Sequence, residues 1–325
     1  MKTFISIGVV AVSVFGVGLL AGCGAEGIEA EQGSEENLGS VSEELGSSTF
    51  LDSSGKVQIR IKMCPWVGPA SNPSATCDVD ADYVLVGGGA QIEGNGNAGA
   101  LLTESYPDSN LGSWRARSKD HVDVYKNRLR AFAIGLRLKN SSGQWISPAT
   151  LKNSIVRREN LSPGTSHQPQ AVAELPPGYK LIGGGAQAHW STKGLLLTQS
   201  YPDGFNWVAE AKDHVASEMG SVSAFAIGIA DTIPNFGSLD VSVNNATVWS
   251  GSGYATASVE PPSNFVLTSI GAYADWNVSG RLLTDMMPLF DLPNENRMGA
   301  WITTKDHKRA ATGNTTAYTI GVKKH

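Results

Sequence analysis

The stretch that decides the fold reads Trp207-Val208-Ala209-Glu210-Ala211-Lys212-Asp213-His214, and Ala224-Phe225-Ala226-Ile227-Gly228 follows it. The same order occurs earlier as Trp114, Lys119-Asp120-His121 and Ala131-Phe132-Ala133-Ile134-Gly135. It occurs again as Trp301, Lys305-Asp306-His307 and Ala317-Tyr318-Thr319-Ile320-Gly321. Successive Lys-Asp-His triplets are 93 residues apart (212 − 119 and 305 − 212). A constant spacing of this kind indicates an internal repeat.

The segments around these motifs also recur in a fixed order. Each repeat opens with an alternating strand (57–61, 154–157, 239–243) and continues with an apolar strand that runs into glycine (83–90, 179–186, 265–272). A Leu-Leu-Thr strand comes next (101–103, 196–198, 282–284). Period-two alternation is typical of strands, and no long helical pattern is present. We therefore predict an all-β protein with three repeats of about six strands each.

The repeats are expected over residues 51–140, 141–233 and 234–325. Two arrangements are open: closure around a pseudo-threefold axis, as in β-prisms, or three small sandwiches in tandem. Closure would remove exposed sheet edges. The glycine triplets Gly87-Gly88-Gly89 and Gly183-Gly184-Gly185 predict a β-bulge or a close approach of another backbone.

Alternation assigns the motif residues to two faces of a strand. The tryptophans and aspartates share the inward face, so Trp114, Trp207 and Trp301 are expected in the core. Asp120, Asp213 and Asp306 are expected to accept backbone N–H bonds at a turn. His121, His214 and His307 lie on the other face and are candidates for ligand contact, with catalysis or metal binding as a less favoured role. The third copy is one residue shorter between Trp and Lys, which predicts a bulge there.

Cys64 and Cys77 are the only cysteines after residue 23. An exported protein folds in an oxidising compartment, so a disulfide between them is the expected pairing, with two free thiols as the alternative.

Two aromatic pairs follow the glycine strands at matching positions, His189-Trp190 and Asp275-Trp276. Indole rings beside polar side chains suit stacking on sugars, so both pairs are candidate glycan contacts. The competing interpretation is that these tryptophans cover small secondary cores.

The repeat argues against catalysis, because acid–base and nucleophilic chemistry needs unlike groups around one substrate. No metal, cofactor or nucleophile motif is present, so we expect no enzyme activity, no metal and no cofactor. A hydrolase with a site near Asp275, Asp285 and Asp291 is the least favoured alternative.

The N-terminal segment is typical of an export signal, with Lys2 and an apolar run to Leu20. Its end, Leu20-Ala21-Gly22-Cys23, resembles the lipobox of bacterial lipoproteins. That resemblance implies removal of residues 1–22, lipidation of Cys23 and, by analogy with Gram-negative lipoproteins, attachment to the outer membrane. Residues 23–50 are rich in Glu, Gly and Ser and are expected to form an acidic tether to the membrane.

The net charge of −5 comes from the tether. Seven glutamates precede Leu51, so the repeats carry 30 − 7 = 23 acids against 25 − 1 = 24 bases. A nearly neutral body argues against a nucleic-acid partner. The order of motifs resembles a repeat of uncharacterised secreted bacterial proteins, and that resemblance implies no activity. We expect a non-catalytic binding module, for glycans or a cell-surface partner, with a structural envelope or adhesion protein as the alternative.

Overall fold

The computed structural model describes residues 46–95, 99–275, 280–290 and 297–325. We call this part of the chain the head. The export signal, Cys23 and most of the tether lie outside it, as do Trp276 and Asp291. Among the described residues, no helix is long and apolar enough to cross a membrane.

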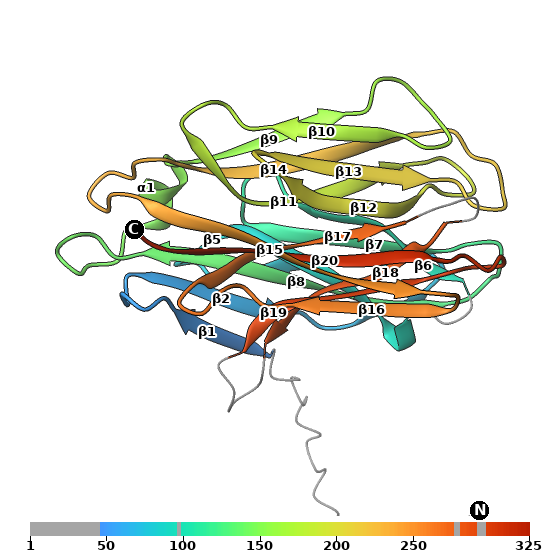
Figure 1. Cartoon of the computed structure of the whole chain (residues 1–325), viewed down its shortest axis with the longest axis horizontal. Helices are drawn as coiled ribbons and strands as arrows, with labels where there is room; N and C mark the ends of the chain where they lie inside the picture. Colours follow the sequence, from blue (N-terminus) through green and yellow to red (C-terminus); the bar gives the residue numbers. More distant parts are fainter. Residues whose placement is uncertain (1–45, 96–98, 276–279, 291–296) are drawn as a thin grey trace, which may run out of the picture. The chain divides into compact units, whose positions relative to one another are not determined.

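The head is all-β, as predicted, and its strands form three sheets (Figure 1). The first sheet has the order β1 (Ser47–Leu51), β2 (Val57–Met63), β8 (Asn127–Leu138), β5 (Val84–Ile92), β18 (Leu282–Phe290), β19 (Met298–Lys305) and β16 (Tyr254–Val259), with β3 (Val67–Ala70) also paired to β8. The second has the order β4 (Ser74–Asp78), β7 (Ser113–Asp120), β6 (Ala100–Pro107), β11 (Tyr179–His189), β14 (Ser221–Ala230) and β9 (Ile155–Leu161). The third has the order β10 (Gln170–Glu174), β13 (Asn206–Lys212), β12 (Leu196–Asp203), β17 (Val266–Ala274), β20 (Gly313–Lys324) and β15 (Leu239–Ser250).

Helical structure is minor. A 3-10 turn covers Glu93–Asn95, and α1 covers Pro148–Lys152 near the start of the second repeat. Ser147 caps α1 by accepting the Thr150 amide, and Pro148 starts it without an N–H to leave unpaired.

The three-repeat organisation is confirmed, and the sheets are shared between the repeats. The first sheet joins repeat 1 to repeat 3, the second joins repeat 1 to repeat 2, and the third joins repeat 2 to repeat 3. Equivalent strand pairs form the three junctions, β5 with β18, β6 with β11 and β12 with β17. The repeats therefore interlock in a cycle, and no sheet belongs to one repeat alone.

The glycine strands β5, β11 and β17 lie where the three repeats meet. The bulges predicted at the glycine triplets are present between Leu85 and Gly87 and between Leu181 and Gly183, and β17 has one at the equivalent position, between Leu267 and Ser269. A Cβ on Gly87 would overlap the carbonyl of Thr268, and one on Gly183 would overlap the carbonyl of Val86. The glycines thus allow backbone to approach backbone between different repeats.

The tryptophan prediction is correct for two copies and wrong for the third. Trp114 and Trp207 are fully buried, whereas Trp301 is 37% exposed. The expected bulge between Trp301 and Lys305 is also wrong, because the pairing of β19 with β16 is continuous. Ala300, five residues before the Lys, occupies the place of the buried tryptophans and pairs with Pro288 as Trp207 pairs with Pro202.

Two further substitutions in repeat 3 explain this exchange. In repeat 2 the Trp207 ring covers Gly184 and its Nε1–H donates to Ser200 Oγ at 3.0 Å. The equivalent positions in repeat 3 hold Ile270 and Met286, both buried. The larger aliphatic side chains fill the volume of an indole, and the hydroxyl that would accept its N–H is gone.

The head begins earlier than the composition suggests. Strand β1 starts at Ser47, inside the segment assigned to the tether, and pairs antiparallel with β2. Phe50 is buried, which gives this short segment an apolar anchor that the acidic sequence before it lacks. The predicted disulfide between Cys64 and Cys77 is confirmed. A loop of this length stabilises a fold by about 3 kcal/mol on the chain-entropy model.

The exchange in repeat 3 gives a matched pair of substitutions. Trp207→Ala should lower the free energy of unfolding by about 3–5 kcal/mol, because it opens a cavity and leaves Ser200 Oγ without its donor. Trp301→Ala should cost less than about 1 kcal/mol, because that ring is partly exposed. Chemical denaturation of both variants checks this, and equal losses would contradict the assignment of Ala300 to the core position.

Candidate functional site

The three motif histidines form a closed ring. His121 Nε2 donates to the His214 carbonyl, His214 Nε2 to the His307 carbonyl, and His307 Nε2 to the His121 carbonyl at 2.8 Å. The imidazole centroids are 5.6–5.9 Å apart, and all three side chains are buried. Each repeat therefore supplies one donor and one acceptor to a cyclic set of hydrogen bonds around a pseudo-threefold axis.

Tight turns hold the accepting carbonyls in place. The amides of Asp123, Ala216 and Arg309 donate back to the carbonyls of His121, His214 and His307 at 2.6–2.7 Å. The residues between them have left-handed backbones: Val122 (φ 65°), Val215 (φ 60°) and Lys308 (φ 60°). Such three-residue turns are rare and strained, above all with a β-branched residue at the centre. The same turn follows the histidine in all three repeats, so the strained backbone recurs wherever a carbonyl accepts a hydrogen bond of the ring.

Burial lowers the pKa of His307 to about 4, although its bond to the His121 carbonyl favours the charged form. This imidazole is therefore neutral at neutral pH, with its proton on Nε2. Among the described residues, no group of three or more His, Cys, Asp or Glu side chains could hold a metal ion.

The motif lysines are more buried than their position in the strand predicts. Alternation places Lys119, Lys212 and Lys305 on the face of the histidines, opposite the predicted core, yet all three are buried, more so than the aspartates. The sheets shared between repeats cover this second face. Desolvation lowers the pKa of Lys305 to about 8.

The aspartates accept turn amides in two copies. Asp213 Oδ2 accepts the Glu218 amide at 3.2 Å and also contacts His167 Nδ1 at 2.7 Å. Asp306 Oδ2 accepts the Ala311 amide at 3.4 Å. Asp120 instead lies 3.9 Å from Lys119 Nζ.

Glu218 forms a latch that the sequence analysis missed. Its carboxylate accepts hydrogen bonds from the amides of Ser191, Thr192 and Lys193 and from the hydroxyls of Ser191 and Thr192, at 2.6–3.1 Å. Burial raises the pKa of Glu218, but these hydrogen bonds outweigh it and hold the pKa far below the ordinary range. The latch joins the loop after Trp190 to the loop that follows His214.

The His189-Trp190 pair is partly buried. His189 Nε2 contacts Ser223 Oγ at 2.9 Å, and burial lowers the pKa of this histidine. The Trp190 ring packs against the core, with Arg117 and Lys119 Nζ 4.9 and 4.7 Å from its centroid. Cations already lie over this indole.

Asp275 accepts the backbone amide and the side-chain amide of Asn314, both at 2.9 Å, and so joins the end of β17 to the start of β20. The structure does not describe Trp276, its neighbour in the sequence. Asp285 is buried, and desolvation raises its pKa to about 6. Neither Asp275 nor Asp285 lines the clefts described next.

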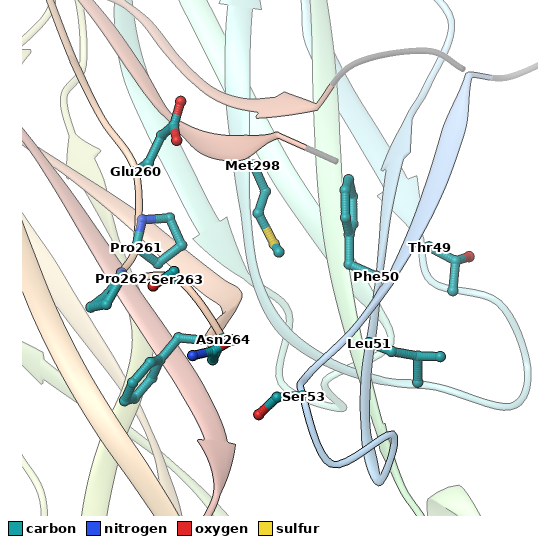
Figure 2. Close-up of a pocket in the computed structure, with 11 residues that line it drawn as sticks. Thr49, Phe50, Leu51, Ser53, Glu260, Pro261, Pro262, Ser263, Asn264 and Met298 are labelled. Carbon is teal, nitrogen blue, oxygen red and sulfur yellow. The ribbon is translucent and has the colours of Figure 1, made fainter. Parts of the chain in front are cut away.

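Two surface clefts share Phe265, where the turn of Pro261, Pro262, Ser263 and Asn264 leads into β17. The first, the Phe50 cleft, encloses about 600 Å³ between this turn and the β1–β2 hairpin. Figure 2 shows Phe50, Met298 and Pro261 around the opening. Its polar groups come from Thr49, Ser53, Glu260, Ser263 and Asn264.

The second, the Phe205 cleft, encloses about 520 Å³. Phe205, 71% exposed at the tip of the β12–β13 turn, faces the same space as Phe265 and Val243. Lys323 Nζ lies 4.9 Å from the Phe265 centroid and 3.7 Å from Asp240 Oδ2. Lys180 Nζ donates to the Leu239 carbonyl at 2.6 Å. Aromatic rings and fixed charges of both signs therefore line one opening.

Repeat 1 differs at the equivalent place. Tyr83, the counterpart of Phe265, is buried, its hydroxyl donates to Gln58 at 2.8 Å, and Arg137 stacks over its ring at 4.8 Å. Arg137 also contacts the Trp145 ring at 4.1 Å. The cleft residues were not predicted, because the tryptophans after the glycine strands were the more prominent aromatic pattern in the sequence. The available signal was Phe205, a large apolar residue in a turn after Gly204.

Comparison with known proteins found no match: no protein-family model matches the sequence, and no curated protein matches it.

The histidine ring predicts a pH dependence of stability. An imidazole has a pKa near 6.5 in an unfolded chain and His307 has a pKa of about 4 in the fold, so between these values the unfolded state binds more protons. His307 should therefore reduce the free energy of unfolding as pH falls from about 6.5 to 4, by about 3 kcal/mol at most. Asp285 has the opposite effect on the free energy of unfolding as pH falls, because its pKa is higher in the folded state than in the unfolded chain.

Comparison with His307→Gln isolates the histidine, since a glutamine N–H can still donate to the His121 carbonyl. The difference in unfolding free energy between the two proteins should change across pH 4–6.5 and stay constant above pH 7. A constant difference over the whole range would contradict a neutral buried His307.

Loss of the Glu218 carboxylate should destabilise the loop that it holds. Glu218→Gln removes one acceptor oxygen and should lower the free energy of unfolding by about 1–3 kcal/mol. Amide hydrogen exchange should increase at residues 191–193, whereas Glu174→Gln, an exposed control at the end of β10, should leave it unchanged. Unaltered exchange in Glu218→Gln would show that the loop does not depend on the carboxylate.

Proposed function

We propose that the head is a non-catalytic binding module that takes glycans in the two clefts around Phe265. The observation that carries the proposal is the Phe205 cleft, where an exposed aromatic ring lies beside Lys323 and Asp240. Aromatic faces stack on the apolar face of a sugar ring, and fixed donors and acceptors orient its hydroxyls.

The arrangement of the motif residues supports a binding role over a catalytic one. The histidines use their Nε2 protons on one another's carbonyls. Asp285, a carboxyl with a raised pKa, is buried and accepts the Ile92 amide at 3.0 Å. Among the described residues that line the clefts, no hydroxyl is hydrogen-bonded to a histidine or a carboxylate. The proposed activity is therefore capture without turnover.

The proposal includes the location of the protein. The lipobox resemblance at Leu20-Ala21-Gly22-Cys23 supports export, lipidation of Cys23 and attachment to the outer membrane, with the remaining acidic segment as a spacer. A tethered head gains from weak sites that act together, and the two neighbouring clefts would bind adjacent units of one polysaccharide.

Phe205→Ala tests the function with little risk to the fold, because the ring is exposed. On a glycan array, the head should bind a defined set of sugars, and Phe205→Ala and Phe265→Ala should weaken that binding about tenfold or more. Tyr254→Ala, an exposed aromatic outside both clefts, is the matched control and should bind like the original protein. Absence of binding to any glycan, or equal binding by all three variants, would refute the proposal.

A further inference from the structure

Strand β15 is an unusual sheet edge. Among the described strands, it ends the third sheet and pairs on one side only, with β20, in twelve consecutive residue pairs without a register shift. The other described end strands, β1, β4, β9, β10 and β16, have five to seven residues. A long regular edge presents a row of unpaired backbone groups to another strand.

The sequence of β15 does not protect this edge. Natural edge strands commonly carry Lys, Pro, a bulge or inward charges that prevent further pairing. β9, the equivalent strand of repeat 2, contains Arg157, Arg158 and Glu159. Between Ser242 and Ser250, β15 has no charged residue and no proline.

Repeat 1 shows that an edge of this kind accepts another strand. Its equivalent strand β2 is covered by β1, which pairs with it antiparallel. Ile61 of β2 is opposite Ile134, and Val243 of β15 is opposite Ile320, the same motif position. Ile61 is fully buried, whereas Val243 is 44% exposed. The third sheet therefore lacks, among the described strands, the cover that the first sheet has.

We propose that two copies of this chain associate by antiparallel pairing of their β15 strands, so that two sheets become one. Pairing about a twofold axis at Ala246 brings Val243 of one copy opposite Trp249 of the other, and this contact occurs twice. Both side chains lie on the same face of the strand, as opposed residues in an antiparallel pair must. Trp249 is 67% exposed.

The pairing has no electrostatic cost. Asn245 lies opposite Thr247, and Asp240 falls outside the paired segment, so no like charges meet. An identical patch on both copies is what a twofold interface requires. Aromatic and β-branched residues make favourable cross-strand pairs. These features favour a second copy over a charged peptide as the occupant of the edge.

Sedimentation velocity of the head over a concentration series tests the proposal. The head holds a complete core and the disulfide, so it is used without the N-terminal segment. A reversible dimer is expected, and Trp249→Lys and Val243→Lys should each weaken it at least about tenfold. Leu161→Lys places the same substitution on the exposed end of β9 and should leave the dimer unchanged.

Cysteine cross-linking tests the register. Ala246→Cys lies opposite its own copy and should form an intermolecular disulfide under mild oxidation, because opposed Cα atoms fall within disulfide range. Asn244→Cys lies opposite Val248 and should cross-link much more slowly. Cys64 and Cys77 are already paired and do not interfere.

A monomer at all concentrations would overturn the proposal. So would a dimer that Trp249→Lys and Val243→Lys do not weaken, or cross-linking of Asn244→Cys in place of Ala246→Cys. Val243 also lines the Phe205 cleft, whereas Trp249 lines neither cleft, so Trp249→Lys is the variant that separates the dimer from glycan binding. Loss of the dimer with unchanged glycan binding in Trp249→Lys supports the pairing of β15.

Discussion

The close approach of the bulged strands β5, β11 and β17 is the constraint on which the rest of the structure depends. A Cβ at Gly87 or Gly183 would overlap a carbonyl of a neighbouring repeat, so the contact exists only because those positions lack a side chain. It brings the three repeats together and makes strand pairing between them possible. A chain with its sheets shared in this way cannot lose one repeat without opening two sheets. Its stability is therefore expected to be cooperative over the whole head.

The symmetry of the interior and the asymmetry of the surface have different causes. The histidine ring requires three equivalent residues, and Leu101, Leu196 and Leu282 form a second threefold cluster. Repeat 3 departs from the pattern elsewhere, with Ile270, Met286 and Ala300 in place of Gly, Ser and Trp. It also buries Arg281, which donates to Thr304, Ala311 and Gly253 where the other repeats have Ala100 and Leu195. The two clefts and the open edge of β15 are all built partly from this divergent repeat. Both proposed binding surfaces, the clefts and the β15 edge, therefore lie where the repeats differ, whereas the contacts that hold the three repeats together lie where they agree.

The Lys-Asp-His motif shows how tertiary structure changes the meaning of a sequence pattern. An Asp–His pair at a strand end suggests a base or a ligand, but the imidazoles here bond to backbone carbonyls of other repeats. This geometry is accompanied by strained left-handed turns at the residues that follow the histidines, Val122, Val215 and Lys308. Two of the three aspartates then accept amides in the loops that carry those turns. The motif therefore recurs because the ring needs one copy from each repeat.

Sequence alone determined the strand content, the threefold repeat, the bulges at the glycines and the Cys64–Cys77 disulfide. Each of these follows from local periodicity, spacing or residue type. Only the tertiary structure shows which repeat pairs with which. Strands pair through backbone N–H and C=O groups, which are nearly the same in every residue, so the sequence does not specify the partner strand. The pairing between repeats also decided which side chains are buried, such as Lys212 and His214, and which are exposed, such as Trp301. Alternation assigns side chains to the two faces of a strand, but it does not show what covers the second face. The Phe50 cleft forms where segments more than two hundred residues apart, such as Phe50 and Pro261, come together, and no local sequence pattern predicts that contact.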